Sequence, residues 1–171
     1  MNQQLEASIT AYDNGYYAKQ LEVGKEFQDF VTREMFRLGW PIVGYSSRKY
    51  QLQYGENIMG AEIKRDQRFR DTGNLYIETE EKADPRNAIF VQSGIFREDN
   101  SILFIIGDDA DFWILATRIL RQLAKAKIGG ELIYRRVEIP TSRGFLLPID
   151  HADKYCIHKV TPAVQPGGYE W

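Results

Sequence analysis

Hydrophobic residues recur at helical spacing near the beginning of the chain. Between about Leu21 and Leu38 the apolar side chains lie three or four positions apart, which places them on one face of an α-helix. Gly39 then provides a C-terminal stop ahead of Pro41. The pattern predicts a helix over residues 21–38, preceded by a loosely ordered lead-in over residues 1–15.

The middle of the chain consists of short runs rich in β-branched and aromatic residues, a composition typical of strands. We expect these runs to form one central sheet. They are Ile42 to Ser46, Tyr50 to Tyr54, Met59 to Asp66, Leu75 to Glu80, Ile89 to Phe96, and Ile102 to Gly107.

A second helical pattern follows and ends at Gly129-Gly130. Three acids precede it, and we interpret them as N-terminal capping residues, since carboxylates there interact favourably with the helix dipole. Two late strands joined by a turn and a tail over residues 162–171 complete the chain. The acids are Asp108, Asp109 and Asp111, the apolar helix positions are Phe112, Leu115, Ile119 and Leu123, and the late strands are Val137 to Ile139 and Phe145 to Ile149.

These elements predict a single α/β domain over residues 1–171, in which a central mixed β-sheet is flanked by helices. The chain is 43% hydrophobic, which is enough for a core without disulfides or metals. Its one cysteine, Cys156, excludes an internal disulfide and fits a reducing compartment. No apolar run approaches the roughly 20 residues that span a bilayer. We therefore expect a soluble, cytoplasmic protein with no membrane attachment.

Two of the predicted strands carry acids at matching positions. If they pair as an antiparallel hairpin about a turn near Arg70, Glu62 lies opposite Glu78 and Lys64 lies opposite Tyr76. The strand period of two then places Glu62, Lys64, Glu78 and Glu80 on one solvent-facing surface. Opposed like charges repel, and a hard cation such as Mg²⁺ would compensate them. Ordinary alternation of apolar and polar residues in a half-exposed hairpin explains the same charges, and a one-residue slip would separate the acids.

The order of helix, acidic strands and basic helix resembles the core of the PD-(D/E)XK nuclease superfamily. Members carry an acid on one strand, a Glu-x-Lys or Glu-x-Glu on the next, and an acid or glutamine on the first helix. By resemblance, Glu62 is the first-strand acid and Glu78-Thr79-Glu80 is the Glu-x-Glu, while Glu26 or Gln28 is the helix residue. The chain departs from the family in lacking a Pro-Asp pair and in having Glu80 where lysine is usual.

A second register of the motif stays open. In it Glu62-Ile63-Lys64 is the Glu-x-Lys and Glu56 is the upstream acid. We rank it lower because six residues leave little room for a turn between adjacent strands. In the first register, Lys64 supplies the missing lysine from the neighbouring strand.

The resemblance implies a DNA endonuclease that uses Mg²⁺ or Mn²⁺. Glu62 and Glu78 would bind the metal, with the Thr79 carbonyl as a further ligand. Lys64 would orient the attacking water or offset negative charge, and Glu80 would hold the metal or the water. Two groups of basic residues would contact phosphates. They are Arg65, Arg68 and Arg70 on the turn, and Arg118, Arg121 and Lys125 on the second helix. A helix face exposed to solvent explains the three helix residues equally well.

Other function classes fit less of the sequence. The net charge of −2 does not indicate nucleic-acid binding, so DNA as a partner requires local basic patches. No Walker-type or dinucleotide-type glycine pattern is present. The alternatives are a non-catalytic module that docks nucleic acid or protein, and a metal-dependent hydrolase of a small phosphorylated molecule. Whether the chain forms a homodimer stays open.

Overall fold

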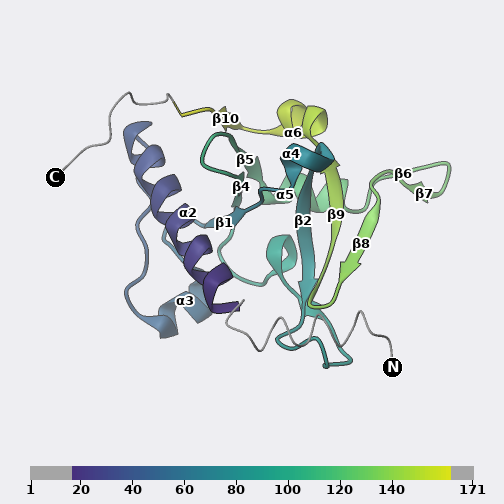
Figure 1. Cartoon of the computed structure of the whole chain (residues 1–171), viewed down its shortest axis with the longest axis horizontal. Helices are drawn as coiled ribbons and strands as arrows, with labels where there is room; N and C mark the ends of the chain where they lie inside the picture. Colours follow the sequence, from purple (N-terminus) through teal and green to yellow (C-terminus); the bar gives the residue numbers. More distant parts are fainter. Residues whose placement is uncertain (1–16, 163–171) are drawn as a thin grey trace.

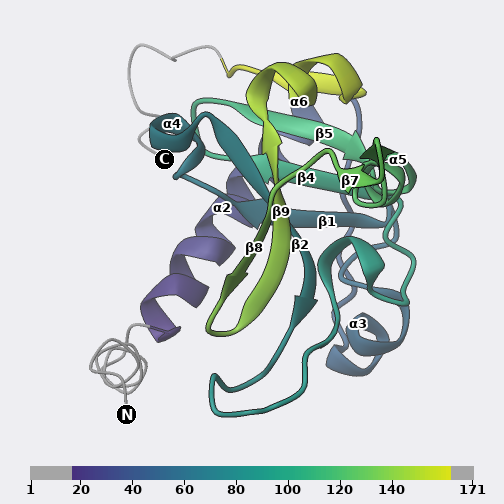
Figure 2. The same cartoon turned by 90° about the vertical axis from the view of Figure 1, so that its right-hand side faces the viewer.

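Two four-stranded β-sheets organise residues 17–162, the part of the chain that the computed structural model describes. The first sheet has the order β1 (Ala61–Arg65), β4 (Leu103–Gly107), β5 (Phe112–Ala116) and β10 (His158–Val160). The second has the order β3 (Val91–Gln92), β2 (Asn74–Glu81), β9 (Ser142–Pro148) and β8 (Arg136–Ile139). Figure 2 shows the strands of the second sheet crossing those of the first at a steep angle.

The first sheet is mixed and the second is antiparallel. In the first, β1 runs parallel to β4, whereas β5 is antiparallel to β4 and to β10. In the second, β2 is antiparallel to β3 and β9, and β8 is antiparallel to β9. The prediction of an α/β fold with a mixed sheet flanked by helices is confirmed at this level.

The long helix α2 (Tyr17–Arg37) covers one face of the first sheet (Figure 1). Phe27, Val31 and Met35 follow one another at intervals of four residues and are at most 2% exposed. They pack against alternate residues of β1, β4, β5 and β10. This spacing is the reason that the sequence predicts the helix correctly.

The other face of the first sheet builds the main core with the second sheet. Phe104 and Ile106 of β4 pack there with Leu75 and Ile77 of β2, while Ile105 faces α2. Four short elements contribute buried residues to this core, and they are α4 (Phe69–Thr72), the 3₁₀ helix η2 (Gly94–Phe96), α5 (Thr117–Leu123) and α6 (Ile149–Tyr155). The other short elements are α3 (Arg48–Tyr54), β6 (Lys127–Ile128) and β7 (Glu131–Leu132).

Several sequence-based boundaries are wrong. The strands form two separate sheets, not one. The segment 42–46 contains only an isolated bridge, and 89–96 divides into β3 and η2. The segment 50–54 is helical, and there Tyr50 and Tyr54, four residues apart, bring their ring centroids to 5.4 Å. Aromatic residues favour strands by composition, but their four-residue spacing fits one helix face.

The second predicted helix begins later than expected. Phe112–Ala116 is strand β5, and Asp108, Asp109 and Asp111 lie in the β4–β5 turn instead of capping a helix. A continuous apolar run of this length is typical of a strand buried on both faces, as β5 is. Gly129-Gly130 forms the turn of the β6–β7 hairpin.

Strand β8 matches its prediction to within one residue, whereas β9 begins at Ser142, three residues before its predicted start, and ends at Pro148. The proposed lead-in and all but the first residue of the proposed tail lie outside the described residues. Within residues 17–162, no helix combines the length and the apolar character needed to cross a membrane.

Candidate functional site

The site is built on the face of β1 that turns away from α2. Ala61 and Ile63 pack beneath α2, so the strand period of two turns Glu62 and Lys64 to the opposite face. Glu62 is only 2% exposed. Its Oε1 atom lies 2.9 Å from Lys64 Nζ, and its Oε2 atom lies 3.6 Å from Arg97 Nη1. These two cations offset the cost of removing the carboxylate from water.

The predicted hairpin register is wrong. β1 pairs with β4, so Glu62 lies opposite Phe104 and not opposite Glu78, which lies opposite Gly144 of β9. Lys64 therefore does not lie opposite Tyr76 either, and Glu62 does not face solvent. Pairing with β4 buries the apolar face of β1 under α2, and the short helix α4 turns the chain into the other sheet.

Glu78 nevertheless belongs to the same cluster. Its carboxylate accepts hydrogen bonds from Ser93 Oγ at 3.0 Å and from Ser142 Oγ at 2.9 Å. Gly94 lets η2 approach β2 here, because a Cβ at this positive-φ residue would lie 2.4 Å from the Glu78 carbonyl oxygen. The cluster thus joins the two sheets across β1 and β2.

Lys64 lies under the influence of both acids. Burial alone would lower the pKa of its ammonium group, but the carboxylates of Glu62 and Glu78 raise the pKa above the ordinary value. The side chain is still 35% exposed. An ammonium group whose protonated form is favoured, and which solvent can reach, is therefore held beside the Glu62 carboxylate and within the electrostatic influence of Glu78.

Glu56 is the third acid at this site. Burial raises its pKa, and the neighbouring charge of Glu62 raises it further. Gln28 of α2 donates a hydrogen bond from Nε2 to Glu56 Oε2 at 3.2 Å. The structure therefore brings together Glu56, Glu62 and Lys64, the residues of the second register, with Gln28, one of the two candidate helix residues, beside Glu56. Glu26 is exposed and makes no hydrogen bond or ion pair with any described residue.

The donor set fits a cation with few protein ligands. Glu62 Oε1 is buried and, despite its ion pair with Lys64, accepts no hydrogen bond. Glu56 and Glu62 are close enough to repel each other. Across residues 17–162, however, no three acidic, histidine or cysteine side chains converge to hold a metal ion. Mg²⁺ commonly takes one or two carboxylates and keeps several waters, so two acids are compatible with it.

Two predicted site residues of β2 have partners other than a metal ion: Glu80, predicted to be catalytic, and Thr79, predicted to bind metal through its carbonyl. A β-bulge between Glu78 and Glu80 interrupts the alternation of side chains. Glu80 lies 3.5 Å from Arg143 and lines a hollow on the second sheet. The Thr79 carbonyl, predicted to bind metal, already accepts a hydrogen bond from the Ser93 amide at 3.1 Å.

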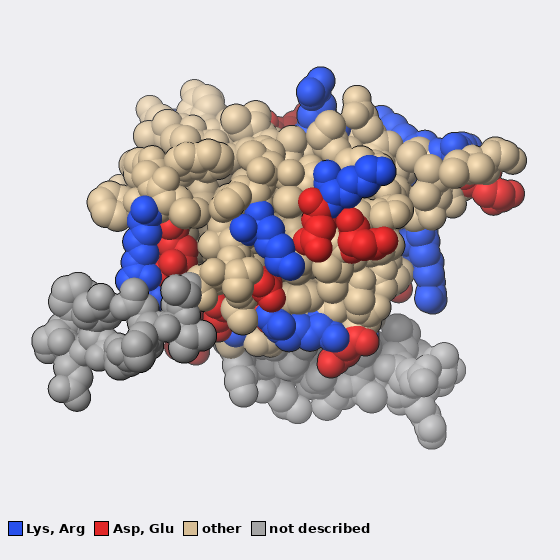
Figure 3. Space-filling model, turned by 90° about the horizontal axis from the view of Figure 1, so that it is seen from above, with Lys and Arg blue, Asp and Glu red and all other residues tan. Residues whose placement is uncertain are grey.

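Most of the predicted phosphate-binding residues have partners within the protein. Arg70 forms a fork with Asp108, and Arg65 Nη2 lies 3.1 Å from Asp109 Oδ2. Arg121 donates to the carbonyl oxygens of Ile95 and Arg97. Basic and acidic side chains are interspersed on the face drawn in Figure 3 and form no single basic patch there. Arg68 and Arg118 are exposed, and Lys125 lies over the Phe96 ring.

The sequence analysis missed three residues of the cluster, which are Ser93, Arg97 and Ser142. Each comes from a segment distant in sequence, and none belongs to a local motif. Arg97 compensates a charge on a strand that precedes it by more than 30 residues.

No protein family matches the chain, and comparisons with curated proteins and with solved structures find no match either. The functional argument therefore rests on the geometry of this cluster.

Proposed function

We propose that the protein is a divergent PD-(D/E)XK-type nuclease that hydrolyses DNA phosphodiester bonds with Mg²⁺ or Mn²⁺. The observation that carries the proposal is the Lys64 ammonium group, which is held 2.9 Å from the buried Glu62 carboxylate and also feels Glu78. Glu62-Ile63-Lys64 then acts as the Glu-x-Lys, with Glu56 as the upstream acid. The mixed sheet covered by α2 is compatible with a restriction-endonuclease-like core.

Each residue has a distinct role in this proposal. Glu62 and Glu56 would hold the cation, which when bound activates water and stabilises charge on the phosphate. Lys64 orients the attacking water and offsets the negative charge that develops on the scissile phosphate. Gln28 positions the Glu56 carboxylate through its hydrogen bond. Glu78 helps to keep Lys64 protonated and has no direct contact with the cation in this register.

The experiment compares cleavage of plasmid and of single-stranded DNA with Mg²⁺ or Mn²⁺, and with a chelator, by the wild type and three variants. Lys64→Ala and Glu56→Gln should lose at least about a hundredfold in cleavage rate, the usual size of a general acid–base or electrostatic contribution. Glu131→Gln is the matched control, because this exposed glutamate of β7 lies outside the cluster, and it should cleave like the wild type. Equal cleavage by all four proteins would indicate a contaminating nuclease and contradict the proposal.

One observation favours a second function, a non-catalytic docking module. Lys64 and Arg97 already compensate Glu62, and within residues 17–162 no three acidic, histidine or cysteine side chains converge to hold a metal ion. Such a module would gain no thermal stability from Mn²⁺ or Mg²⁺, whereas a metal-dependent site gains stability by mass action. Absence of both cleavage and metal stabilisation in the wild type would favour the docking module.

A further inference from the structure

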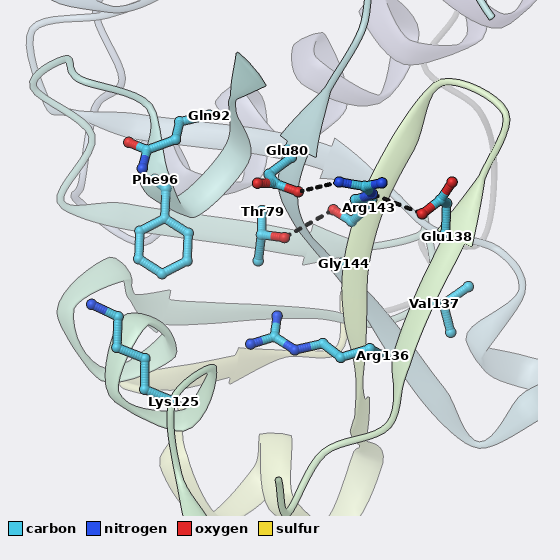
Figure 4. A pocket seen from close by; sticks show the side chains of 10 residues that line it. All are labelled: Thr79, Glu80, Gln92, Phe96, Lys125, Arg136, Val137, Glu138, Arg143 and Gly144. Carbon is cyan, nitrogen blue, oxygen red and sulfur yellow. Dashed lines mark hydrogen bonds and ion pairs between the residues drawn. The ribbon is translucent and has the colours of Figure 1, made fainter. Parts of the chain in front are cut away.

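Two adjoining hollows lie along the second sheet, beside the cluster described above. The larger has a volume of about 620 Å³ and the smaller about 370 Å³. Both are lined by Gln92, Phe96 and Lys125, so they form one continuous groove, referred to below as the η2 groove. Figure 4 shows the larger hollow, with Lys125 and Arg136 at one end and the Glu80–Arg143–Glu138 ion pairs at the other.

Three cations of the η2 groove have no acidic partner. Among residues 17–162, Arg121, Lys125 and Arg136 form no ion pair. Arg121 and Arg136 donate to carbonyl oxygens, which fixes each guanidinium group without neutralising it. Five cations and four acids line the groove, so it carries a small excess of positive charge although the whole chain carries −2. The acids are Glu80 and Glu138 in the larger hollow and Glu98 and Asp99 in the smaller. The three cations without an acidic partner are the ones that attract anions.

An aromatic ring accompanies these cations. Phe96 lines both hollows, and Lys125 Nζ lies 5.4 Å from the centroid of its ring. The guanidinium carbon of Arg136 lies 5.7 Å from the centroid of the Phe145 ring, so the sheet supports this cation. Alternating cations and an aromatic face are the two elements by which proteins bind single-stranded nucleic acid.

The η2 groove borders the Glu62 cluster. Arg97 lines the smaller hollow and forms ion pairs with Glu62 at 3.6 Å and with Glu81 at 3.7 Å. Arg121 binds the carbonyl oxygens of Ile95 and Arg97 and so ties α5 to this wall. A ligand that fills the groove therefore reaches the residue that compensates Glu62.

We propose that the η2 groove binds a single strand of nucleic acid, with phosphates at Arg121, Lys125 and Arg136 and a base against Phe96. This inference rests on the proposed function and assigns it a substrate class, a strand that is unpaired beside the cleavage site. Each hollow has the volume of a small-molecule site, which suits one unstacked nucleotide and not a stacked duplex. Arg97 links the bound strand to the Glu62 cluster.

The test measures fluorescence anisotropy of a labelled oligo-dT strand with a chelator present, so that no cleavage occurs. Lys125→Ala with Arg136→Ala should weaken binding at least about tenfold, since one lost charge-assisted contact is worth about that factor. The slope of log affinity against log salt should fall by roughly 1.4, about 0.7 for each phosphate contact to a single strand. Wild-type affinity and slope in this variant would overturn the proposal.

A matched variant controls for net charge. Lys127→Ala with Arg135→Ala removes the same two charges from exposed positions that do not line the groove, and it should bind like the wild type. Lys125→Glu is a second test that should leave the fold intact, because Lys125 is exposed and donates no hydrogen bond to a described residue. It should also lose at least about tenfold in affinity. Equal losses in the groove pair and the control pair would show that only net charge matters and would contradict the proposal.

Competitors identify the ligand class. Unlabelled single strands should displace the probe, whereas a duplex, dTMP, inorganic phosphate and poly-glutamate should not at matched phosphate or charge concentration. Displacement by any of these four would overturn the single-strand assignment. Groove-dependent binding without metal-dependent cleavage would leave the groove standing and refute the nuclease. Metal-dependent cleavage by a protein whose strand binding is unaffected by the groove variants would support the nuclease and refute the groove as the binding site.

Discussion

Two clusters of charge share strand β1 and behave in opposite ways. The Glu62 cluster comprises Glu56, Glu62, Lys64, Glu78 and Arg97, and the Asp108 loop comprises Arg65, Arg70, Asp108, Asp109 and Asp111. Each combines three acids with two cations. The Asp108 loop satisfies its central acid completely. Arg70 donates to both carboxylate oxygens at 2.5 and 2.7 Å, and the amides of Ala110 and Asp111 donate at 2.9 and 3.0 Å.

The Glu62 cluster leaves its central acid incompletely satisfied. Glu62 Oε1 accepts no hydrogen bond, and Glu56 beside it is held in an environment that resists ionisation. The pKa values of Glu56 and Asp108 accordingly shift in opposite directions. Burial raises the pKa of Glu56, whereas for Asp108 the hydrogen bonds from Arg70 and the loop amides outweigh burial and lower the pKa. An added cation would relieve the first cluster and would have nothing to improve in the second.

Removing the central acid of the Glu62 cluster should have the largest effect on stability. Glu62→Ala leaves Lys64 and Arg97 partly buried without their shared counter-ion. We expect a loss of about 2–4 kcal/mol in the free energy of unfolding, below the full cost for a fully buried pair because both cations are about one-third exposed. Urea denaturation measures it. The control is Asp109→Ala, whose side chain is 58% exposed and should cost less than about 0.5 kcal/mol. Equal costs would erase the distinction between the clusters.

The difference between the clusters shows what the sequence could and could not predict. Local spacing predicted α2, β1, β2 and β4, because a helix face or a strand period is visible within a few residues. It did not predict that β1 pairs with β4, some 40 residues later, because strand pairing is a non-local choice. The hairpin prediction followed the assumption that adjacent strands are partners.

The residues of the site also divide into those that local spacing predicted and those that only the tertiary fold brings in. Glu62 and Lys64 were predicted because they lie two residues apart on one strand face. Arg97 and Ser142 were not, because they reach the cluster only through the tertiary fold. The three acids of the Asp108 loop looked like helix caps because Phe112 continues the apolar pattern, and only the β4–β5 pairing shows that they form a turn.

Disrupting the Asp108 loop should have an intermediate effect with a characteristic pH dependence. Asp108→Asn weakens the fork with Arg70 and should cost roughly 1–3 kcal/mol at neutral pH, the range for hydrogen bonds to charged groups. Because the folded-state pKa of Asp108 lies below its ordinary value of 3.8, its contribution is present above pH 3.8 and is lost as the pH falls through the lowered value. Urea titrations at several pH values measure this. A cost that does not shrink in acid would mean that the fork contributes through packing and not through charge.

Neutralising Glu56 should have the smallest effect and the opposite pH dependence. Glu56→Gln keeps an oxygen to accept the Gln28 hydrogen bond and removes a carboxylate that burial and Glu62 both disfavour. The variant should therefore be more stable than the wild type at neutral pH, by about 0.5 kcal/mol or less. Because the folded-state pKa of Glu56 lies above its ordinary value of 4.5, the stability that this group contributes is present below pH 4.5 and lost as the pH rises through the raised value.

The advantage of Glu56→Gln should accordingly disappear as the pH falls towards 4.5 and the wild-type carboxyl takes up its proton. Adding Mg²⁺ at neutral pH should reverse the order, because only the wild type keeps both carboxylates and gains stability by mass action. Thermal melts of the two proteins with Mg²⁺ and with a chelator measure both effects. If the variant is instead less stable than the wild type at neutral pH without metal, the Glu56 carboxylate already has favourable partners in the protein. The contrast with the Asp108 loop would then not indicate a cation-binding site.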